Sequence, residues 1–314
     1  MSGEPTVSVV IPTMDRADRL ERAVESVIDQ TYDDIEIIVV DGGSTDRTPN
    51  LVSEYQQRLG ERRVTYLRNE NPQGLPAARN LGVEATDTDY IAFLDDDDIW
   101  HSPKTERQVD RLDPLEGEGM CYTGITSRTP DGEYVHTRKS APGDDLYERL
   151  LIRNVIGTPS TVLVTREAFE EIGQFDADLQ YQEDWDFYLR MAQAYDVVCV
   201  SDPLVTRISH DESMSSDVET QKEYRERILD RYADERGERG LKSEARATHH
   251  RDTGIAYCLN DEIKAGAREF RTALQYRVNA GTILLYLLSR TGKRGFRTAV
   301  RTKRNLNRAI GMFS

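Results

Sequence analysis

Short apolar runs alternate with amphipathic segments along the first hundred residues of this 314-residue chain. The runs have the β-branched and aromatic content of buried strands, and the segments between them place apolar residues at helical spacing. We expect strands at 7–11, 35–40, 64–67 and 90–94, with helices at about 16–30, 47–58 and 77–85. Strands separated by helices at this spacing pair in parallel, so the sequence predicts an α/β fold with a doubly wound, mostly parallel sheet.

The pattern weakens after residue 115 and changes character after about 215. Further short strands are expected at 121–127, 133–136, 161–164, 197–200 and 204–208, with a helix at 184–194. Residues 244–276 have the spacing of a helical hairpin that resembles one tetratricopeptide unit. We therefore predict a main domain at 1–215, a C-terminal helical extension at 216–288 and a separate tail at 289–314.

The tail reverses the charge of the chain. Formal net charge is -15 overall, yet residues 289–314 contain eight Lys or Arg and no Asp or Glu. In a helix the basic side chains share one face and the apolar ones lie nearly opposite. Such a helix suits the surface of an anionic membrane, so we predict peripheral contact through 290–314. The alternative is that the tail docks on the acidic body of the chain itself.

Composition narrows the class of protein. With 56 acidic against 41 basic residues, nucleic acid is an unsuitable partner for the main body, because phosphates require a basic surface. Only seven of the basic residues are lysine, a balance that resembles proteins of salt-loving organisms. Cys121, Cys199 and Cys258 are scattered, which argues against a disulfide framework. The polar N-terminus and the lack of a long apolar stretch lead us to expect a cytoplasmic protein.

Four consecutive carboxylates, Asp95 to Asp98, follow the fourth predicted strand directly. Adjacent charges are too costly to bury unpaired, so we expect them just past the carboxyl end of the strand, where open α/β sheets bind ligands. Closely spaced carboxylates suit Mg²⁺ or Mn²⁺. Asp95 and Asp97 point the same way in an extended segment and could share one cation. The spacing also allows Asp96 with Asp98, and Asp98 could instead cap the next helix. The simpler interpretation is a solvated acidic turn.

Two further loops should meet this one, because the carboxyl ends of parallel strands share one edge of a sheet. They are 12–16 and 41–46. Asp41 could accept hydrogen bonds from a nucleobase or a ribose, or it could simply form an Asp-Gly turn. Arg79 follows a Gly/Pro loop and could bind a phosphate with both arms of its guanidinium, or it could lie on a solvated helix face.

Acidic residues also open the predicted helix at 184–194. Asp184 could act as a general base, although acids at a helix start are stabilised by the helix dipole without any function. His210 could bind a metal or a diphosphate, or it could be solvated. There is no GxSxG, GxxxxGK[ST] or GxGxxG motif, which counts against hydrolase, P-loop and dinucleotide-binding classes.

Five segments, in this order, resemble family 2 glycosyltransferases with the GT-A fold. They are VSVVIPT from Val7, EIIVVDGGSTD from Glu36, GLPAARNLG from Gly74, IAFLDDDD from Ile91, and the pair Glu183-Asp184. The resemblance covers roughly residues 5–212. It implies an inverting, metal-dependent enzyme that transfers a sugar from a nucleotide diphosphate donor with Mg²⁺ or Mn²⁺.

The resemblance also implies roles for individual residues. Those expected at the donor are Pro12, Thr13, Asp15, Asp41, Arg79, Asp95 and Asp96. Asp95 and Asp97 match the Asp-x-Asp pair that binds ribose and metal, and Asp184 matches the catalytic base. His210 resembles a position that helps to hold the metal or the diphosphate. The chain has Asp41-Gly42 where many members have two aspartates, and Arg-x-x-His where a tighter spacing is common.

The expected acceptor is a lipid-linked or surface glycan, because the basic tail would bring the enzyme to the cytoplasmic face of a membrane. Two other classes remain open from the sequence. One is a sugar-nucleotide nucleotidylyltransferase, although its glycine-rich first loop is absent from 12–16. The other is a non-catalytic module that binds sugar nucleotides.

Overall fold

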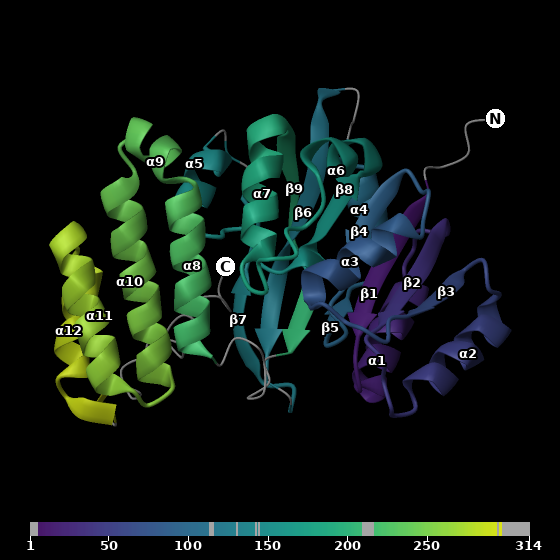
Figure 1. Ribbon diagram of the computed structural model, residues 1–314, viewed down its shortest axis with the longest axis horizontal. Coiled ribbons are helices and arrows are strands. Elements are labelled where there is room, and N and C mark those ends of the chain that lie inside the picture. The colour runs from purple at the N-terminus through teal and green to yellow at the C-terminus, as the bar shows by residue number, and fades with distance from the viewer. Residues whose placement is uncertain are drawn as a thin grey trace. The chain divides into compact units, whose positions relative to one another are not determined.

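The computed structural model describes residues 6–112, 116–129, 131–141, 143, 145–208, 217–293 and 295–296. The chain forms two compact units (Figure 1). The sheet unit comprises Met1–Leu146 and Ile156–Ser209, and the helical unit comprises Tyr147–Val155 and His210–Ser314.

The sheet unit contains one nine-stranded sheet among its described residues, in the order β3-β2-β1-β4-β8-β6-β9-β5, with β7 paired to β6. The strands are β1 (Val7–Thr13), β2 (Ile35–Asp41), β3 (Val64–Arg68), β4 (Tyr90–Phe93), β5 (Asp98–Trp100), β6 (Glu118–Arg128), β7 (Tyr134–Arg138), β8 (Val162–Thr165) and β9 (Asp196–Ile208). β3, β2, β1 and β4 pair in parallel, and β8 joins β4 to β6 through antiparallel pairings. The predicted α/β fold is confirmed.

Different helices cover the two faces of the parallel strands. Alternate side chains such as Val9 and Ile11 share a buried cluster with helices α1 (Ala17–Ile28) and α2 (Thr48–Leu59). The opposite face carries α3 (Leu75–Glu84), where a Cβ added to Gly82 would lie only 2.3 Å from Cγ1 of Val10. The period of two along a strand sends successive side chains to opposite faces, which produces this double winding.

Aromatic rings extend the second face toward the C-terminal part of the sheet unit. Phe93 of β4 lies 5.1 Å from Phe175, and Phe175 stacks on Phe187 at 4.6 Å between ring centroids. Phe187 belongs to α7 (Glu183–Ala194), and α6 (Arg166–Ile172) packs beside it through Phe169. This apolar cluster fixes where α7 begins relative to the end of β4.

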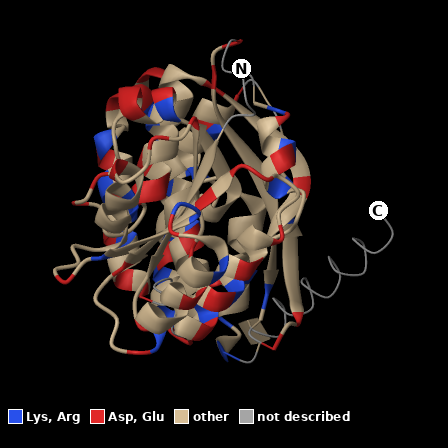
Figure 2. Ribbon diagram, turned by 90° about the vertical axis from the view of Figure 1, so that its right-hand side faces the viewer, with Lys and Arg blue, Asp and Glu red and all other residues tan. Residues whose placement is uncertain are grey.

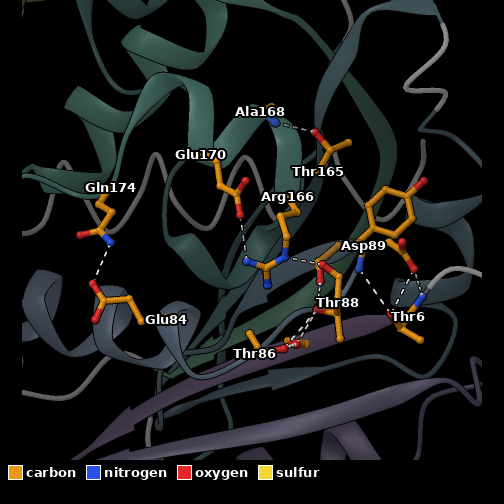
Figure 3. Close-up of polar contacts among 12 residues, drawn as sticks. Thr6, Glu84, Thr86, Thr88, Asp89, Thr165, Arg166, Ala168, Glu170 and Gln174 are labelled. Atoms are coloured by element: carbon orange, nitrogen blue, oxygen red, sulfur yellow. Dashed lines mark hydrogen bonds and ion pairs between the residues drawn. The ribbon is translucent and has the colours of Figure 1, made fainter.

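Polar contacts hold the edge of the sheet where β4 begins (Figure 3). Asp89 accepts a hydrogen bond from the Thr6 amide at 2.7 Å, and Nε of Arg166 donates to the Thr88 carbonyl at 2.6 Å. The Thr165 hydroxyl caps α6 by accepting from the Ala168 amide at 3.2 Å. These contacts secure the amino-terminal end of β4. The acidic run, Asp95 to Asp98, follows the other end of this strand.

The structure corrects two local predictions. The strands expected at 197–200 and 204–208 form one strand, β9, whose pairing with β6 shifts register near Gly124. Asp98 does not cap the next helix, because it begins β5 and pairs with Arg207 of β9. The helix that follows, α4 (Lys104–Val109), starts after Pro103 instead.

The helical unit contains α5 (Leu146–Ile152) from residue 147 onward, α8 (Val218–Arg231), α9 (Ala233–Glu238), α10 (Lys242–Leu259), α11 (Ile263–Tyr276) and α12 (Ala280–Ser289). α10 and α11 form the hairpin expected at 244–276. They approach closely because both lack a side chain at the crossing, where Gly254 faces Phe270 and Gly266 faces Cys258. The buried guanidinium of Arg236 donates to the carbonyls of Leu151, Ile228 and Leu229, which ties 147–155 to the helices.

Charged residues lie mainly on helices and loops in the part of the chain drawn in colour, whereas the strands carry few (Figure 2). Buried acids are therefore exceptions that need an explanation.

No helix among the described residues has the length and apolar character needed to cross a bilayer. Two predictions, the role of His210 and the helix over 297–314, concern residues outside the described part of the chain.

Candidate active site

Three loops meet at one edge of the sheet, as the parallel pairing requires. Thr13 at the end of β1 is in register with Asp41 at the end of β2, and Val10 is in register with Phe93. The Leu94 amide donates to the Val10 carbonyl at 3.0 Å, which places the acidic run beside the end of β1. The expected convergence of the loops at 12–16, 41–46 and 95–98 is therefore present.

The four aspartates alternate between two environments. Asp96 and Asp98 are buried, with only 4% and 2% of each residue exposed. The side chains of Asp95 and Asp97 keep 25% and 22% of their surface exposed. The pair that remains accessible to a ligand is thus Asp95 with Asp97. All four follow the end of β4, as expected, although two of them are buried there.

Asp96 is buried because the first loop satisfies it. Its carboxylate accepts from the Thr13 hydroxyl at 2.8 Å and from Nη1 of Arg16 at 3.2 Å. Burial raises the pKa of Asp96 to about 6, against the lowering effect of Arg16. Burial also raises the pKa of Asp98 well above its usual value, and the neighbouring charge of Asp95 adds to this. A raised pKa favours the neutral acid, which reduces the cost of burying adjacent carboxyls.

Arg79 links the acidic run to the start of α7. The guanidinium is fully buried, with Nη2 at 2.7 Å from Oδ1 of Asp95 and Nη1 at 2.6 Å from Oε1 of Glu183. The solvated face considered for Arg79 is therefore wrong. Burial acts to raise the pKa of Asp95, but Arg79 and the Thr158 hydroxyl, which donates at 2.7 Å, outweigh it and lower that pKa. Asp95 is held as a carboxylate.

Asn80, next to Arg79, positions the loop that precedes α7. Its side-chain amide donates to the Phe175 carbonyl at 2.8 Å and accepts from the Phe175 amide at 3.0 Å. The ring of Phe175 lies 5.6 Å from the Arg79 guanidinium. Sequence reasoning assigned no role to Asn80 or Glu183, although both belong to segments that it singled out.

Asp184 follows Glu183 at the first turn of α7, after Gln182 in a left-handed conformation with φ of 63°. Burial, followed by the charge of Glu183, raises the pKa of Asp184 to about 7. Its Oδ1 accepts from the Trp185 amide at 2.7 Å. Asp184 is thus a half-buried residue whose pKa lies near neutral, and its neighbour Glu183 is linked through Arg79 to Asp95.

Asp41 is fully buried and its oxygens are already bonded. Oδ1 accepts from the Ser44 amide at 2.8 Å and Oδ2 accepts from the Tyr66 hydroxyl at 2.5 Å. Nη1 of Arg68 lies 3.7 Å from Oδ2. A nucleobase could reach this carboxylate only if one of these partners moved.

Asp15, in the first loop, forms hydrogen bonds with the second loop. It has φ of 52°, and its Oδ1 accepts from the Thr45 amide at 2.6 Å. That hydrogen bond is the main cause of its lowered pKa. Pro12 lies within β1, in register with Val40. These residues shape the edge of the site through loop-to-loop contacts.

The described residues contain no group of three or more His, Cys, Asp or Glu side chains placed to hold a metal ion. The accessible pair Asp95 and Asp97 nevertheless offers oxygen ligands of the kind that Mg²⁺ uses, since Mg²⁺ commonly takes one or two carboxylates and completes its shell with substrate phosphates and water. The donor set therefore fits a cation that arrives with a diphosphate.

Sequence comparison shows to which proteins this chain is related. The model of the family described as "Glycosyl transferase family 2" matches residues 8–173. TuaG of Bacillus subtilis, whose name assigns it to teichuronic acid biosynthesis, is 35% identical over 171 residues, covering 54% of this chain and 66% of TuaG. A PGL/p-HBAD biosynthesis glycosyltransferase of Mycobacterium bovis is 29% identical over 208 residues, covering 66% of this chain and 74% of that protein. An uncharacterised glycosyltransferase of Haemophilus influenzae is 27% identical over 217 residues, covering 68% and 72%.

Solved structures show the same fold at low identity. The mannosyltransferase PcManGT of Pyrobaculum calidifontis, in complex with GDP-Man and Mn²⁺, has a TM-score of 0.62 at 16% identity and covers 98% of this chain and 87% of its own. S. aureus TarS 1-349 in complex with UDP-GlcNAc has a TM-score of 0.59 at 17% identity, covering 96% and 92%. The GT-A fold is confirmed. Because the family model spans more than half of the sequence, the chain belongs to glycosyl transferase family 2.

Proposed function

We propose that the protein is an inverting glycosyltransferase that moves a sugar from a nucleotide diphosphate donor to a lipid-linked or surface-glycan acceptor. The observation that carries the proposal is the buried chain of contacts from Asp95 through Arg79 to Glu183. It joins an accessible acidic pair to a carboxyl with a pKa of about 7 at the start of α7.

Asp95 and Asp97 are the proposed ligands of Mg²⁺ or Mn²⁺. They are also proposed to contact the ribose of the donor. Asp95 suits this role because Arg79 keeps it ionised. A bound cation would neutralise charge on the departing diphosphate. His210 stays a candidate ligand for the metal or the diphosphate. Support for the donor class comes from the GDP-Man and UDP-GlcNAc complexes of PcManGT and TarS.

Asp184 is the proposed base. In a single displacement it would accept the proton of the acceptor hydroxyl, while that oxygen bonds to the anomeric carbon and the bond to the diphosphate breaks. A base works best when its pKa lies near the operating pH, and burial brings Asp184 to about 7. Inversion follows from a single displacement, and no enzyme nucleophile is needed.

The remaining donor-site residues act mainly by holding the loops. Thr13 and Asp96 bond the first loop to the acidic run, and Asp15 bonds the first loop to the second. We infer that Pro12 contributes to the nucleotide-contacting edge, that Asp41 would contact the nucleotide only after Ser44 or Tyr66 moves, and that Arg79 acts on the donor by fixing Asp95. Arg79 is therefore a positioning residue.

We infer the class of acceptor from related enzymes. The names of TuaG and the M. bovis relative connect related enzymes with teichuronic acid and PGL/p-HBAD biosynthesis. A glycan or lipid-linked acceptor fits these names. We propose that the basic residues of 290–314 bring the enzyme to the cytoplasmic face of the membrane where such acceptors are found.

The test is a panel of sugar nucleotides with Mn²⁺, scored by release of the nucleoside diphosphate. Asp184→Asn should reduce turnover by at least about 100-fold while calorimetry shows unchanged donor affinity. Asp178→Asn, which alters an exposed acid shortly before α7, is the control and should keep full turnover. If the wild-type protein bound a donor but released no diphosphate with any acceptor extract, the non-catalytic binding module would be correct.

A further inference from the structure

Helix α12 is apolar on every side. Its ten residues, Ala280–Ser289, include no charged side chain. The inner side is explained by packing, because Leu285, Tyr286 and Leu288 lie against the buried cluster that contains Phe270. A helix on the surface of a soluble protein normally carries polar residues on its other side. The outer side of α12 lacks them.

Three large apolar side chains lie on that outer side. Ile283, Leu284 and Leu287 are 39%, 56% and 57% exposed, and Val278, just before the helix, is 76% exposed. Residues three and four apart lie on one face of a helix, so Ile283 and Leu284 both neighbour Leu287. We call these four residues the α12 apolar face. Grouped exposed apolar side chains mark interaction sites, whereas single ones are ordinary.

The charged residues of the chain segment that carries this face have one sign. From Arg271 to Ser314 the chain has ten Lys or Arg and no Asp or Glu, although it has 56 acids in all. Arg277 precedes α12 and Arg290 follows it, and both are exposed. Arg277 and Lys293 contact Glu244 and Asp261, acids that belong to the preceding helices and their connection. The apolar face is thus bounded by cations at both ends.

We propose that the α12 apolar face docks on an anionic lipid bilayer, with Arg277 and Arg290 at the level of the headgroups. Apolar side chains bounded by cations are the pattern of helices that lie in a membrane interface. Ten residues span about 15 Å at 1.5 Å per residue, half of the roughly 30 Å hydrocarbon core, so α12 lies in the interface and does not cross it. The inference deepens the proposed function, because it places the enzyme where a lipid-linked acceptor would be.

Charge favours lipid over the two competing occupants. A second copy of the α12 apolar face would bring Arg277 and Arg290 against the same cations. Residues 297–314 contain Arg and Lys but no acid, so docking them on this face would bring further cations beside Arg277 and Arg290. Like charges oppose such contacts, whereas anionic headgroups attract every one of these side chains.

The test uses the full-length protein and vesicles of phosphatidylcholine, with or without one third phosphatidylglycerol, scored by co-flotation without any donor. Replacing Ile283, Leu284 and Leu287 together by serine should weaken binding to the anionic vesicles by tenfold or more, because each buried aliphatic side chain contributes strongly to partitioning. Arg290→Gln should weaken it by about fivefold. Leu259→Ser is the control, since Leu259 is 47% exposed at the end of α10 and should leave binding unchanged.

Each outcome decides the matter. Unchanged flotation of the triple serine variant, with circular dichroism showing that it is folded, overturns the proposal. A dimer in sedimentation equilibrium that only the triple variant abolishes would identify a second copy as the occupant. Loss of flotation in Arg301→Gln/Arg304→Gln with none in the triple variant would assign membrane contact to the tail alone. Because flotation needs no turnover, failure here is distinguishable from failure of the glycosyltransferase proposal.

Discussion

Several buried charged residues of the sheet unit hold one another in place. Arg79 is shared by Asp95 and Glu183, which come from the end of β4 and the start of α7. Removing one member of such a group leaves an unpaired buried charge, which costs about 3–5 kcal/mol. The site residues are therefore also stability residues, and their ionisation affects folding as well as catalysis.

Asp184 should affect activity and stability in opposite directions as the pH changes. Its pKa of about 7 lies above the usual 3.8, so the fold disfavours the charged form. Between about pH 4 and 7 the unfolded chain releases this proton first, and the native state loses stability as the pH rises. The base proposed for the reaction must be ionised to accept a proton, so kcat/KM should fall about tenfold per unit below pH 7.

Urea unfolding of Asp184→Asn tests the predicted effect of this carboxyl on stability. At pH 8 the variant should have a free energy of unfolding that is larger than wild type by on the order of 1 kcal/mol. At pH 4 the difference should be much smaller, because the native carboxyl is then protonated and the unfolded one, with its usual pKa of 3.8, is only partly ionised. A variant that is less stable than wild type at pH 8 would show that the carboxylate is satisfied in the fold and that its pKa is not raised.

At the scale of elements, helix α3 positions two side chains of the candidate site. It presents Arg79 to β4 and α7, and Asn80 to the loop before α7. Its distance from the sheet is set by Gly82, which faces Val10 and Val40 without a side chain. A close glycine contact is a feature of packing that has direct consequences for the position of Arg79.

Gly82→Ala should destabilise the protein by about 1–3 kcal/mol and lower kcat, because the new Cβ would overlap Val10 and push α3 outward. Gly237→Ala in α9 is the matched control. Its Cβ would have nothing within 4 Å, so the exchange should be neutral or stabilising by about 0.5–1 kcal/mol. Adding Val10→Ala to Gly82→Ala should restore part of both losses. No recovery in that double variant would show that the space between α3 and β1 is not the cause.

At the scale of the whole molecule, the net charge of -15 makes self-repulsion a general term in stability. Salt shortens the Debye length from about 10 Å at 0.1 M to about 3 Å at 1 M, which screens that repulsion. The same screening weakens any attraction between the basic C-terminal residues and anionic lipid. A higher salt concentration should thus stabilise the folded chain and weaken its membrane contact.

Raising NaCl from 0.1 to 1 M at pH 8 should increase the thermal midpoint by at least about 2 °C. At pH 5, near the sequence pI of about 4.9, the net charge is small and the increase should largely disappear. Differential scanning calorimetry at both pH values makes the comparison. An equal increase at both would point to a general salting effect on apolar surface instead of charge repulsion.

The sequence by itself determined the order of strands and helices up to β4, the shared edge of the three loops and the family. These depend on local periodicity and on short motifs, which each segment carries independently of its neighbours. It also identified 244–276 as a hairpin. It divided β9 in two and left a helix cap open for Asp98, because the pairing of β5 and β6 with β9 joins residues about eighty to 110 positions apart.

Only the tertiary structure decided which of the four aspartates face outward. Spacing allowed Asp95 with Asp97 or Asp96 with Asp98, and the choice depended on Thr13 and Arg16 from another loop. In the same way, Tyr66 determined that Asp41 is fully bonded, and packing on α11 left one side of α12 exposed. The environment of a side chain is set by segments distant in sequence, and periodicity within its own segment does not specify them.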